Sequence, residues 1–310
     1  MILRLSIVAV ILFNALGCSS SITTPPSFDG DRAYGFLLKQ VEFGPRVPGS
    51  DPWRNCRTYF NEYFTGLGLQ VDSQNFSFID PYSNREIPLV NVIARYRGGK
   101  ADELPVALMA HWDSRPRADY ATNPGLADQP IDGANDGASG VAVLMELAHM
   151  VTEQKAPSNV DFVLVDGEDW GKSGDIDYYL LGSKYFAAAG DGIRGKYRFG
   201  IVVDMIGDKD QKILREGFSQ RFEAAVNDMV WKAARDLGVT TFVDSVTQDI
   251  FDDHLSLATA GVPAIDIIDF DYRYWHTELD TPDKCSPESL ANVGKVLARI
   301  LYNPSLWPKI

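Results

Sequence analysis

The chain has 310 residues, of which 45% are hydrophobic and 23% charged, the balance of an ordinary globular protein of one sizeable α/β domain or two small ones. Its formal net charge at pH 7 is −13. A chain this acidic offers no basic surface, so we exclude nucleic acids and anionic membrane surfaces as charge-driven partners.

The first predicted element is an export signal over residues 1–17. Arg4 precedes an almost uninterrupted apolar run that is too short to span a bilayer. The small residues before Cys18 resemble a bacterial lipoprotein cleavage site, with alanine where leucine is commoner. We therefore expect a Ser-, Thr- and Pro-rich tether over residues 18–30, lipidated on Cys18, that holds an exported protein at the periplasmic or outer-membrane side of the bacterial envelope. A plain cleaved signal and a short anchor are the alternatives.

The remaining residues, 31–310, are predicted to form one domain. Apolar spacing indicates helices at 31–41 and 53–67 and strands at 69–78 and 90–96. Short apolar strands then alternate with helices, with strands expected at 105–110, 160–165, 199–203 and 262–268, and helices at 138–152, 183–189, 221–237 and 287–301. This pattern predicts an α/β fold with a mixed, mostly parallel central sheet flanked by helices on both faces.

Two polar stretches interrupt the alternation. Residues 115–132 have no periodicity, and a loop of that length inside a compact domain is usually functional or mobile. We expect it to form a rim or lid, with residues 170–181 as a second rim. Cys56 and Cys285 are the other two cysteines, and a disulfide between them and two buried free thiols are equally consistent with an exported protein.

Polar residues collect where the predicted strands end. In doubly wound sheets, ligands bind at the carboxyl ends of the strands, so these segments are expected to converge on one rim. The glycine-rich turn at 131–140 leads into a helix and carries Asp136 between small residues, which lets the backbone approach whatever that carboxylate holds. The converging segments are residues 111–114 (HWDS), 166–169 (DGED), 204–207 (DMIG) and 274–277 (YWHT).

These segments suggest a metal site. Three of the four histidines, His111, His254 and His276, stand beside acidic residues at such boundaries. Carboxylates with imidazole suit zinc, whereas calcium would require more oxygen ligands and no histidine. A complete phosphate loop, which needs a further glycine five positions before Gly-Lys-Ser/Thr, is absent, because Asp166 stands at that position before Gly171-Lys172-Ser173. A Gly-x-Ser-x-Gly elbow is also absent from the sequence. For His254 and its neighbour Asp253, capping of the next helix is an equally good interpretation.

In this order, the motifs resemble the zinc aminopeptidase-like superfamily and, within it, the animal-type glutaminyl cyclases found in bacteria. The resemblance runs from about residue 31 to residue 301. The motifs at 111–114, 133–140, 166–169 and 204–207 are shared with aminopeptidases. Asp252-Asp253-His254 and Trp275-His276 favour the cyclases, since aminopeptidases more often carry Ser-Asp-His and Tyr-His.

The resemblance implies one zinc per chain, held by Asp136, Asp169 and His276. Animal cyclases usually have a second glutamate where this chain has Asp169. Aspartate is one methylene shorter, so that metal bond requires a closer backbone. The animal enzymes also pair cysteines near the sheet edge, and Ala110 stands at the first of those positions, which excludes that disulfide.

The resemblance also implies the catalytic roles. Glu168 matches the catalytic acid/base, and Asp204 and Asp252 match two acids that share hydrogen bonds beside it. Trp275 matches an indole that lines the substrate pocket, and Ile250 an apolar wall. The implied reaction is cyclisation of N-terminal glutamine in peptides or proteins to pyroglutamate with release of ammonia, by a monomeric enzyme.

Two other functions remain open at the level of sequence. A zinc aminopeptidase with a two-metal site would draw its second ligand set from His111, Asp136 and Asp204, which are all present. Trp275 and Asp252 are the residues that distinguish the cyclase from it. A surface lipoprotein that keeps the fold without activity is the third possibility, although such relatives generally lose metal ligands.

Overall fold

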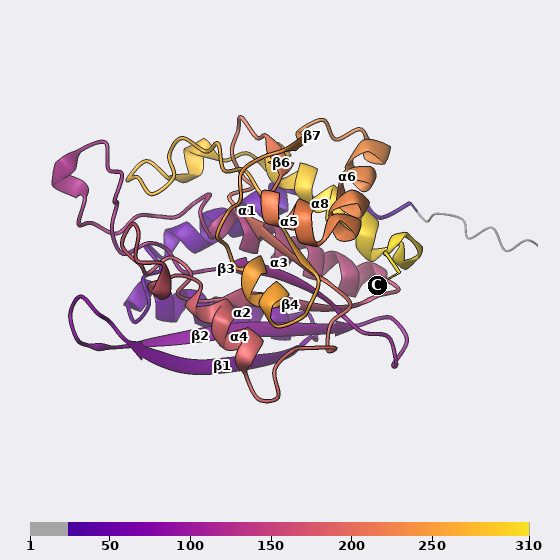
Figure 1. Cartoon of the computed structure of the whole chain (residues 1–310), viewed down its shortest axis with the longest axis horizontal. Helices are drawn as coiled ribbons and strands as arrows, with labels where there is room; N and C mark the ends of the chain where they lie inside the picture. Colours follow the sequence, from indigo (N-terminus) through magenta and orange to yellow (C-terminus); the bar gives the residue numbers. More distant parts are fainter. Residues whose placement is uncertain (1–23, 310) are drawn as a thin grey trace, which may run out of the picture.

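The computed structural model describes residues 24–309 (Figure 1). The predicted signal peptide and Cys18 lie outside the described residues. The end of the predicted tether is already part of the fold, because Phe28 is buried against Gly294 and the Asp29 side chain caps the first helix by accepting the Arg32 backbone N–H at 2.9 Å. The folded domain therefore begins slightly before residue 31. Within residues 24–309, none of the helices has the length and apolar character needed to cross a membrane.

A six-stranded mixed sheet forms the centre of the domain. The two amino-terminal strands run antiparallel, and the other four are parallel to one another, which confirms the predicted fold class. In spatial order the strands are β1 (Gln70–Ile79), β2 (Glu86–Arg97), β4 (Asn159–Val165), β3 (Val106–His111), β5 (Gly200–Asp204) and β8 (Ala264–Ile268).

Helices cover both faces of this sheet because the parallel strands are apolar on both sides. In β3, Val106, Leu108 and Ala110 belong to one buried cluster, while Ala107 and Met109 belong to the other. The first cluster is covered by α1 (Gly30–Glu42), α2 (Asp51–Gly66), α3 (Ala138–Gln154), α6 (Ala224–Leu237) and α8 (Pro287–Leu301). The second is covered by α4 (Leu181–Ala188) and α7 (His254–Thr259), and Figure 1 shows α4 in front of the sheet.

Local capping signals explain why several helices begin where the sequence predicts. Ser50 accepts the Trp53 backbone N–H at 3.2 Å at the start of α2, and Ser286 accepts the Ser289 N–H at 3.1 Å at the start of α8. Pro287 is the first residue of α8, where a missing N–H has no cost.

The predicted helix at 221–237 is wrong in its boundaries. The structure divides this region into α5 (Gly217–Phe222) and α6, because Glu223 leaves helical geometry with φ −130°. The short parallel ribbon of β6 (Ile213–Arg215) and β7 (Phe242–Val246) was also not predicted. The helix α7 was anticipated only as the element that Asp253 and His254 would cap, without bounds.

A close contact between α3 and β5 positions the glycine-rich turn. A Cβ on Gly140 would lie 2.3 Å from the Val203 carbonyl oxygen, so only glycine lets the first turn of α3 approach the strand this closely. Gly137, immediately before the helix, has φ 95°, which a side chain would oppose. The turn therefore brings Asp136 to the carboxyl end of the sheet.

Candidate active site

A cavity of about 240 Å³ opens at the carboxyl ends of the parallel strands. All eight residues to which the resemblance to cyclases assigned a role line it, so the predicted convergence is present in the fold. Both expected rims also contribute, the first through Tyr120 and the second through Ser173, Ile176 and Tyr179. The eight residues are Asp136, Glu168, Asp169, Asp204, Ile250, Asp252, Trp275 and His276.

Asp136, Asp169 and His276 form a buried group that fits a zinc ion. Their potential ligand atoms lie within 4.8 Å of one another, and His276 Nε2 is 3.2 Å from Asp169 Oδ1 and 3.8 Å from Asp136 Oδ2. Zinc bonds of about 2.1 Å in a tetrahedron imply roughly 3.4 Å between ligand atoms. Asp136 Oδ2 and Asp169 Oδ2 are both buried without a hydrogen-bond partner. Buried carboxylate oxygens of this kind need a cation or a donor.

A second group shares Asp136 with the first. His111 Nε2 lies 3.1 Å from Asp136 Oδ1 and 3.2 Å from Asp204 Oδ1, and all three residues are buried. These three atoms could hold a second ion around the shared carboxylate. The geometry therefore accommodates one zinc or two.

Arg115 supports the first group from behind. Its buried guanidinium donates to Asp169 Oδ1 at 2.5 Å and to the Asp169 carbonyl oxygen at 3.1 Å, and it also pairs with Asp119. Burial alone would raise the pKa of Asp169, but Arg115 and His276 outweigh it and hold that pKa below its ordinary value. Asp169 is thus kept as an anion, the form that binds a metal.

Asp280 fixes the turn that carries Asp136. Its carboxylate accepts the backbone N–H groups of Asn135 at 2.9 Å and Asp136 at 3.1 Å, and the Tyr272 hydroxyl at 2.7 Å. Burial, followed by the charge of Asp136, raises the pKa of Asp280 to about 7. The sequence prediction missed both Arg115 and Asp280. In the sequence, Arg115 stood out only as a member of the expected first rim, and Asp280 only by its position four residues after His276.

Glu168 lines the cavity and is only partly buried. Its backbone N–H donates to Asp113 Oδ1 at 3.2 Å, while the N–H of Asp169 donates to Asp113 Oδ2 at 3.3 Å. Asp113 therefore orients both consecutive acids. Loss of solvent, followed by the charge of Asp169, raises the pKa of Glu168 well above its ordinary value.

Asp252 and Ile250 reach the cavity from one loop. The Ile250 N–H donates to Glu216 Oε1 at 2.9 Å, so the loop is held from beneath by a buried carboxylate. The interpretation of Asp253 and His254 as caps of the following helix is wrong. Asp253 makes no capping hydrogen bond to α7, and His254 points to Glu216, with Nε2 3.3 Å from Glu216 Oε2.

Aromatic rings close one side of the cavity. The Trp275 ring centroid lies 5.4 Å from that of Tyr120, 5.1 Å from that of Phe270 and 3.9 Å from that of His276. His276 itself has φ 56°, and Met205, another lining residue, has φ 47°. A positive φ is unfavourable for residues other than glycine, so the surrounding packing must hold both residues in this conformation.

Other residues near the motifs have structural roles. Asp166 accepts the Trp53 indole N–H at 2.9 Å and the Val90 N–H at 2.7 Å, and Trp112 is a core aromatic with no exposed surface. Cys56 and Cys285 are both free and buried, which corresponds to the second of the two cysteine alternatives.

Residues 91–301 match peptidase family M28. The fold is similar to Bacteroides thetaiotaomicron glutaminyl cyclase bound to N-acetylhistamine (TM-score 0.84, 35% identity, 90% of this chain and 99% of that chain). It is equally similar to a leucine aminopeptidase precursor from the same organism (TM-score 0.85, 35% identity, 91% and 99%). A probable zinc metalloprotease of Leptosphaeria maculans is 30% identical over 145 residues, which span 44% of this chain and 30% of that protein.

Proposed function

The chain belongs to peptidase family M28, and from that premise we propose that it is a zinc-dependent glutaminyl cyclase. The reaction would convert N-terminal glutamine of peptides to pyroglutamate and release ammonia. The observation that carries this proposal is the grouping of Glu168, Asp204 and Asp252 in one cavity with the Trp275 indole. The similarity to the Bacteroides thetaiotaomicron glutaminyl cyclase supports it.

The cavity has the parts that intramolecular attack requires. The α-amine nitrogen of glutamine would bond to its own side-chain amide carbon, and the bond from that carbon to the amide nitrogen would break. Confining the folded-back side chain against Trp275 and Ile250 would supply much of the acceleration, since both reacting groups belong to one residue. Zinc bound to Asp136, Asp169 and His276 would polarise the amide carbonyl.

Glu168 would carry the proton. Its carboxylate takes a proton from the attacking amine and delivers it to the leaving nitrogen, which departs as ammonia. A group that must accept and then release a proton works best when its pKa is closer to the working pH, and the pKa of Glu168 is raised. Asp204 and Asp252 add negative charge beside it, and Asp252 is one of the causes of that rise.

A zinc aminopeptidase is the second candidate, and a specific observation favours it. His111, Asp136 and Asp204 form the second three-residue group, which could hold another zinc. In that enzyme Asp204 would be a metal ligand instead of an acid beside Glu168. The similarity to the leucine aminopeptidase precursor is of the same strength as that to the cyclase.

One assay separates the two candidates. Purified protein of measured zinc content is given one peptide that begins with Gln and one that begins with Leu. Ammonia and a pyroglutamyl product from the first peptide alone, with one zinc per chain, is the expected result. Free leucine from the second peptide, with two zincs per chain, would replace the cyclase with the aminopeptidase. If neither peptide gave a product, the third alternative, a lipoprotein without enzymatic activity, would be favoured.

We also propose that the enzyme is a monomer attached to the bacterial envelope through lipid on Cys18, where exported peptides would reach the cavity. The support is the order of charged, apolar and small residues before Cys18. The change Cys18→Ser should move the protein from the membrane fraction to the soluble fraction. An unchanged distribution between the two fractions would contradict the anchor.

A further inference from the structure

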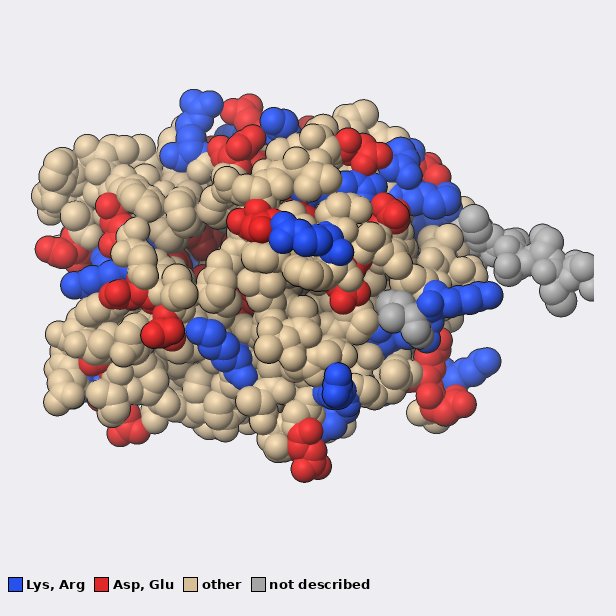
Figure 2. All heavy atoms as spheres, viewed as in Figure 1, with Lys and Arg blue, Asp and Glu red and all other residues tan. Residues whose placement is uncertain are grey.

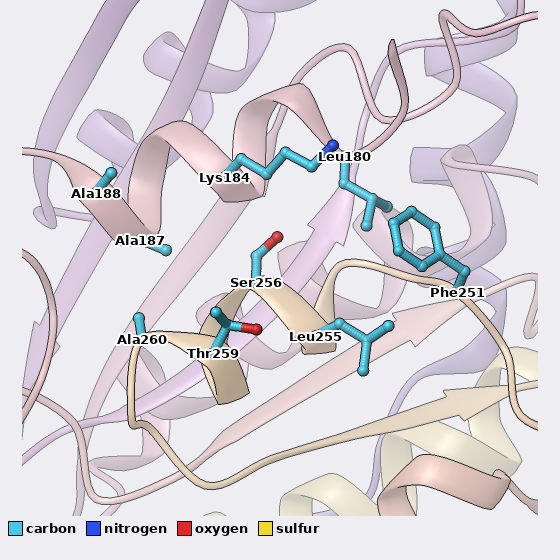
Figure 3. Close-up of a pocket in the computed structure, with 9 residues that line it drawn as sticks. All are labelled: Leu180, Lys184, Ala187, Ala188, Phe251, Leu255, Ser256, Thr259 and Ala260. Atoms are coloured by element: carbon cyan, nitrogen blue, oxygen red, sulfur yellow. The ribbon is translucent and has the colours of Figure 1, made fainter. Parts of the chain in front are cut away.

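A second hollow, of about 350 Å³, lies between α4 and α7. Figure 3 shows the side chains of the two helices facing each other across it, with Leu180 and Phe251 close together at one end. We call it the α4/α7 groove. Its lining residues are Leu180, Lys184, Ala187, Ala188, Phe251, Leu255, Ser256, Thr259 and Ala260.

The groove adjoins the catalytic cavity at the end where Leu180 and Phe251 lie (Figure 3). Phe251 lines both spaces, and its side chain is about half exposed, at 48%. At the same end, Tyr179 lines the cavity and the next residue, Leu180, lines the groove (Figure 3). The Leu180 N–H donates to the Glu168 carbonyl oxygen at 2.9 Å. The groove wall is therefore attached directly to the backbone of the proposed acid/base.

The polar groups of the groove are mostly engaged with the protein itself. The Lys184 ammonium donates to the Tyr179 carbonyl oxygen at 2.8 Å, and the Ser183 hydroxyl donates to the Ser256 hydroxyl at 2.8 Å. What remains for a ligand is hydrocarbon from Leu255 and the alanines, together with the Phe251 ring. Such a surface binds apolar side chains by removing both partners from water.

We propose that the α4/α7 groove is a subsite for the peptide substrate, which holds an apolar side chain downstream of the N-terminal residue. This proposal rests on the proposed function, because a peptide that enters by its N-terminus must leave the cavity along one of its walls. Phe251 forms the wall that the cavity and the groove share. A substrate chain passing over Phe251 brings its later side chains to the groove.

The test uses five-residue peptides that begin with Gln. The reference peptide has serine at positions 2–5, and four others carry leucine at one of these positions in turn. Ammonia and any released N-terminal residue are both measured. At one position, leucine should raise kcat/KM by about tenfold over the reference, since burying part of a leucine side chain is worth that factor in binding.

The variants place bulk or charge inside the groove. Ala188→Trp fills it from α4, and Thr259→Glu places a carboxylate on it from α7; both positions are exposed. Each should reduce the leucine preference to less than about twofold. The matched control is Ala225→Trp, the same change at an exposed helical position of α6 outside the groove, which should keep the tenfold preference.

Several outcomes would overturn the subsite. A wild-type enzyme without a leucine preference at any position, or a preference that survives both groove variants, contradicts it while leaving the cyclase intact. Wild-type dimers that Ala188→Trp dissociates, with the peptide preference unchanged, would assign the groove to a second copy of the chain. If the peptides yield free N-terminal residues without ammonia, the cyclase proposal fails, and the same leucine ratios still decide the subsite.

Discussion

Buried carboxylates occur at two sites, Glu216 at one and Asp136 with Asp169 at the other, and the two sites satisfy their charge in opposite ways. Glu216 accepts the N–H groups of Phe218, Ser219 and Ile250 at 2.6–2.9 Å, and also the Ser219 hydroxyl at 2.7 Å. Asp136 and Asp169 belong, with His276, to the metal-site group. One oxygen of Asp136 and one of Asp169 have no hydrogen-bond partner. Since a buried carboxylate without partners is costly, Glu216 is structural, whereas Asp136 and Asp169 are arranged for a cation.

The pKa shifts of the two groups follow from this contrast. Burial raises the pKa of Glu216, but the His254 ring and the backbone N–H groups outweigh it and lower that pKa to about 2. The pKa of Asp136 is raised, first by burial and then by the charge of Asp169. Backbone donors do for Glu216 what a bound ion would do for Asp136.

The largest expected effect is on turnover and comes from changing Glu168, which belongs neither to the metal-site group nor to the Glu216 site. Glu168→Gln should lower kcat by about 10²–10⁴, the usual contribution of a positioned acid/base, while zinc stays bound. Turnover of the Gln-initiated peptide and zinc content measured on the same sample check this. Loss of zinc instead would mean that Glu168 is a ligand and that its role and that of Asp169 are exchanged.

The next effect is expected at the metal-site group itself. His276→Ala should remove zinc, and with it the stability that zinc contributes, about 4 kcal/mol when free zinc exceeds its dissociation constant a thousandfold. Thermal unfolding with and without a chelator checks this, because wild-type protein should lose melting temperature on chelation and the variant should not. Equal responses of the two proteins would place zinc elsewhere.

A smaller effect is expected at the satisfied group. With a pKa of about 2 when folded against its ordinary 4.5, Glu216 should contribute roughly 3 kcal/mol at pH 7. The folded pKa is the lower one, so this stability is fully present above about pH 4.5 and disappears as the pH falls towards 2. Urea unfolding of Glu216→Gln at pH 7 and pH 3 tests the sign, and zinc content should stay at the wild-type level. A variant equally destabilised at both pH values would show that the charge is not the cause.

The smallest effect on stability is expected at an ion pair that is exposed to solvent. Arg221 pairs with Asp249, and both side chains are substantially exposed, at 54% and 40%. Arg221→Ala should leave the midpoint of urea unfolding almost unchanged, because solvent screens the pair. A clear fall in that midpoint would mean that this pair orders the loop leading to Ile250.

The sequence predicted the sheet and its main helices because their apolar patterns are regular. The pattern could not show that Glu223 divides one helix into α5 and α6, since Ala224 and the residues after it keep helical spacing. The ribbon of β6 and β7 escaped because its strands are three and five residues long and stand outside the main sheet.

For the site, sequence motifs predicted the residues that face the cavity, and the fold brings all eight together. The residues that support them were missed because their partners are far away in sequence. Arg115 contacts Asp169 across 54 positions, and Asp280 contacts the backbone of Asp136 across 144. No local spacing encodes such contacts, and they emerge only when the strands are assembled.

The positive φ angles of Leu180, Met205 and His276 have a consequence for changing this protein by selection. Each strained residue costs roughly 1–3 kcal/mol, and all three line the cavity or the adjoining groove. Selection for heat resistance alone would favour substitutions that remove the backbone strain at these positions. Such substitutions would also change the arrangement of the residues that line the cavity and the groove. Thermostable variants that remain active should therefore carry their substitutions elsewhere, in the helices on the far face of the sheet.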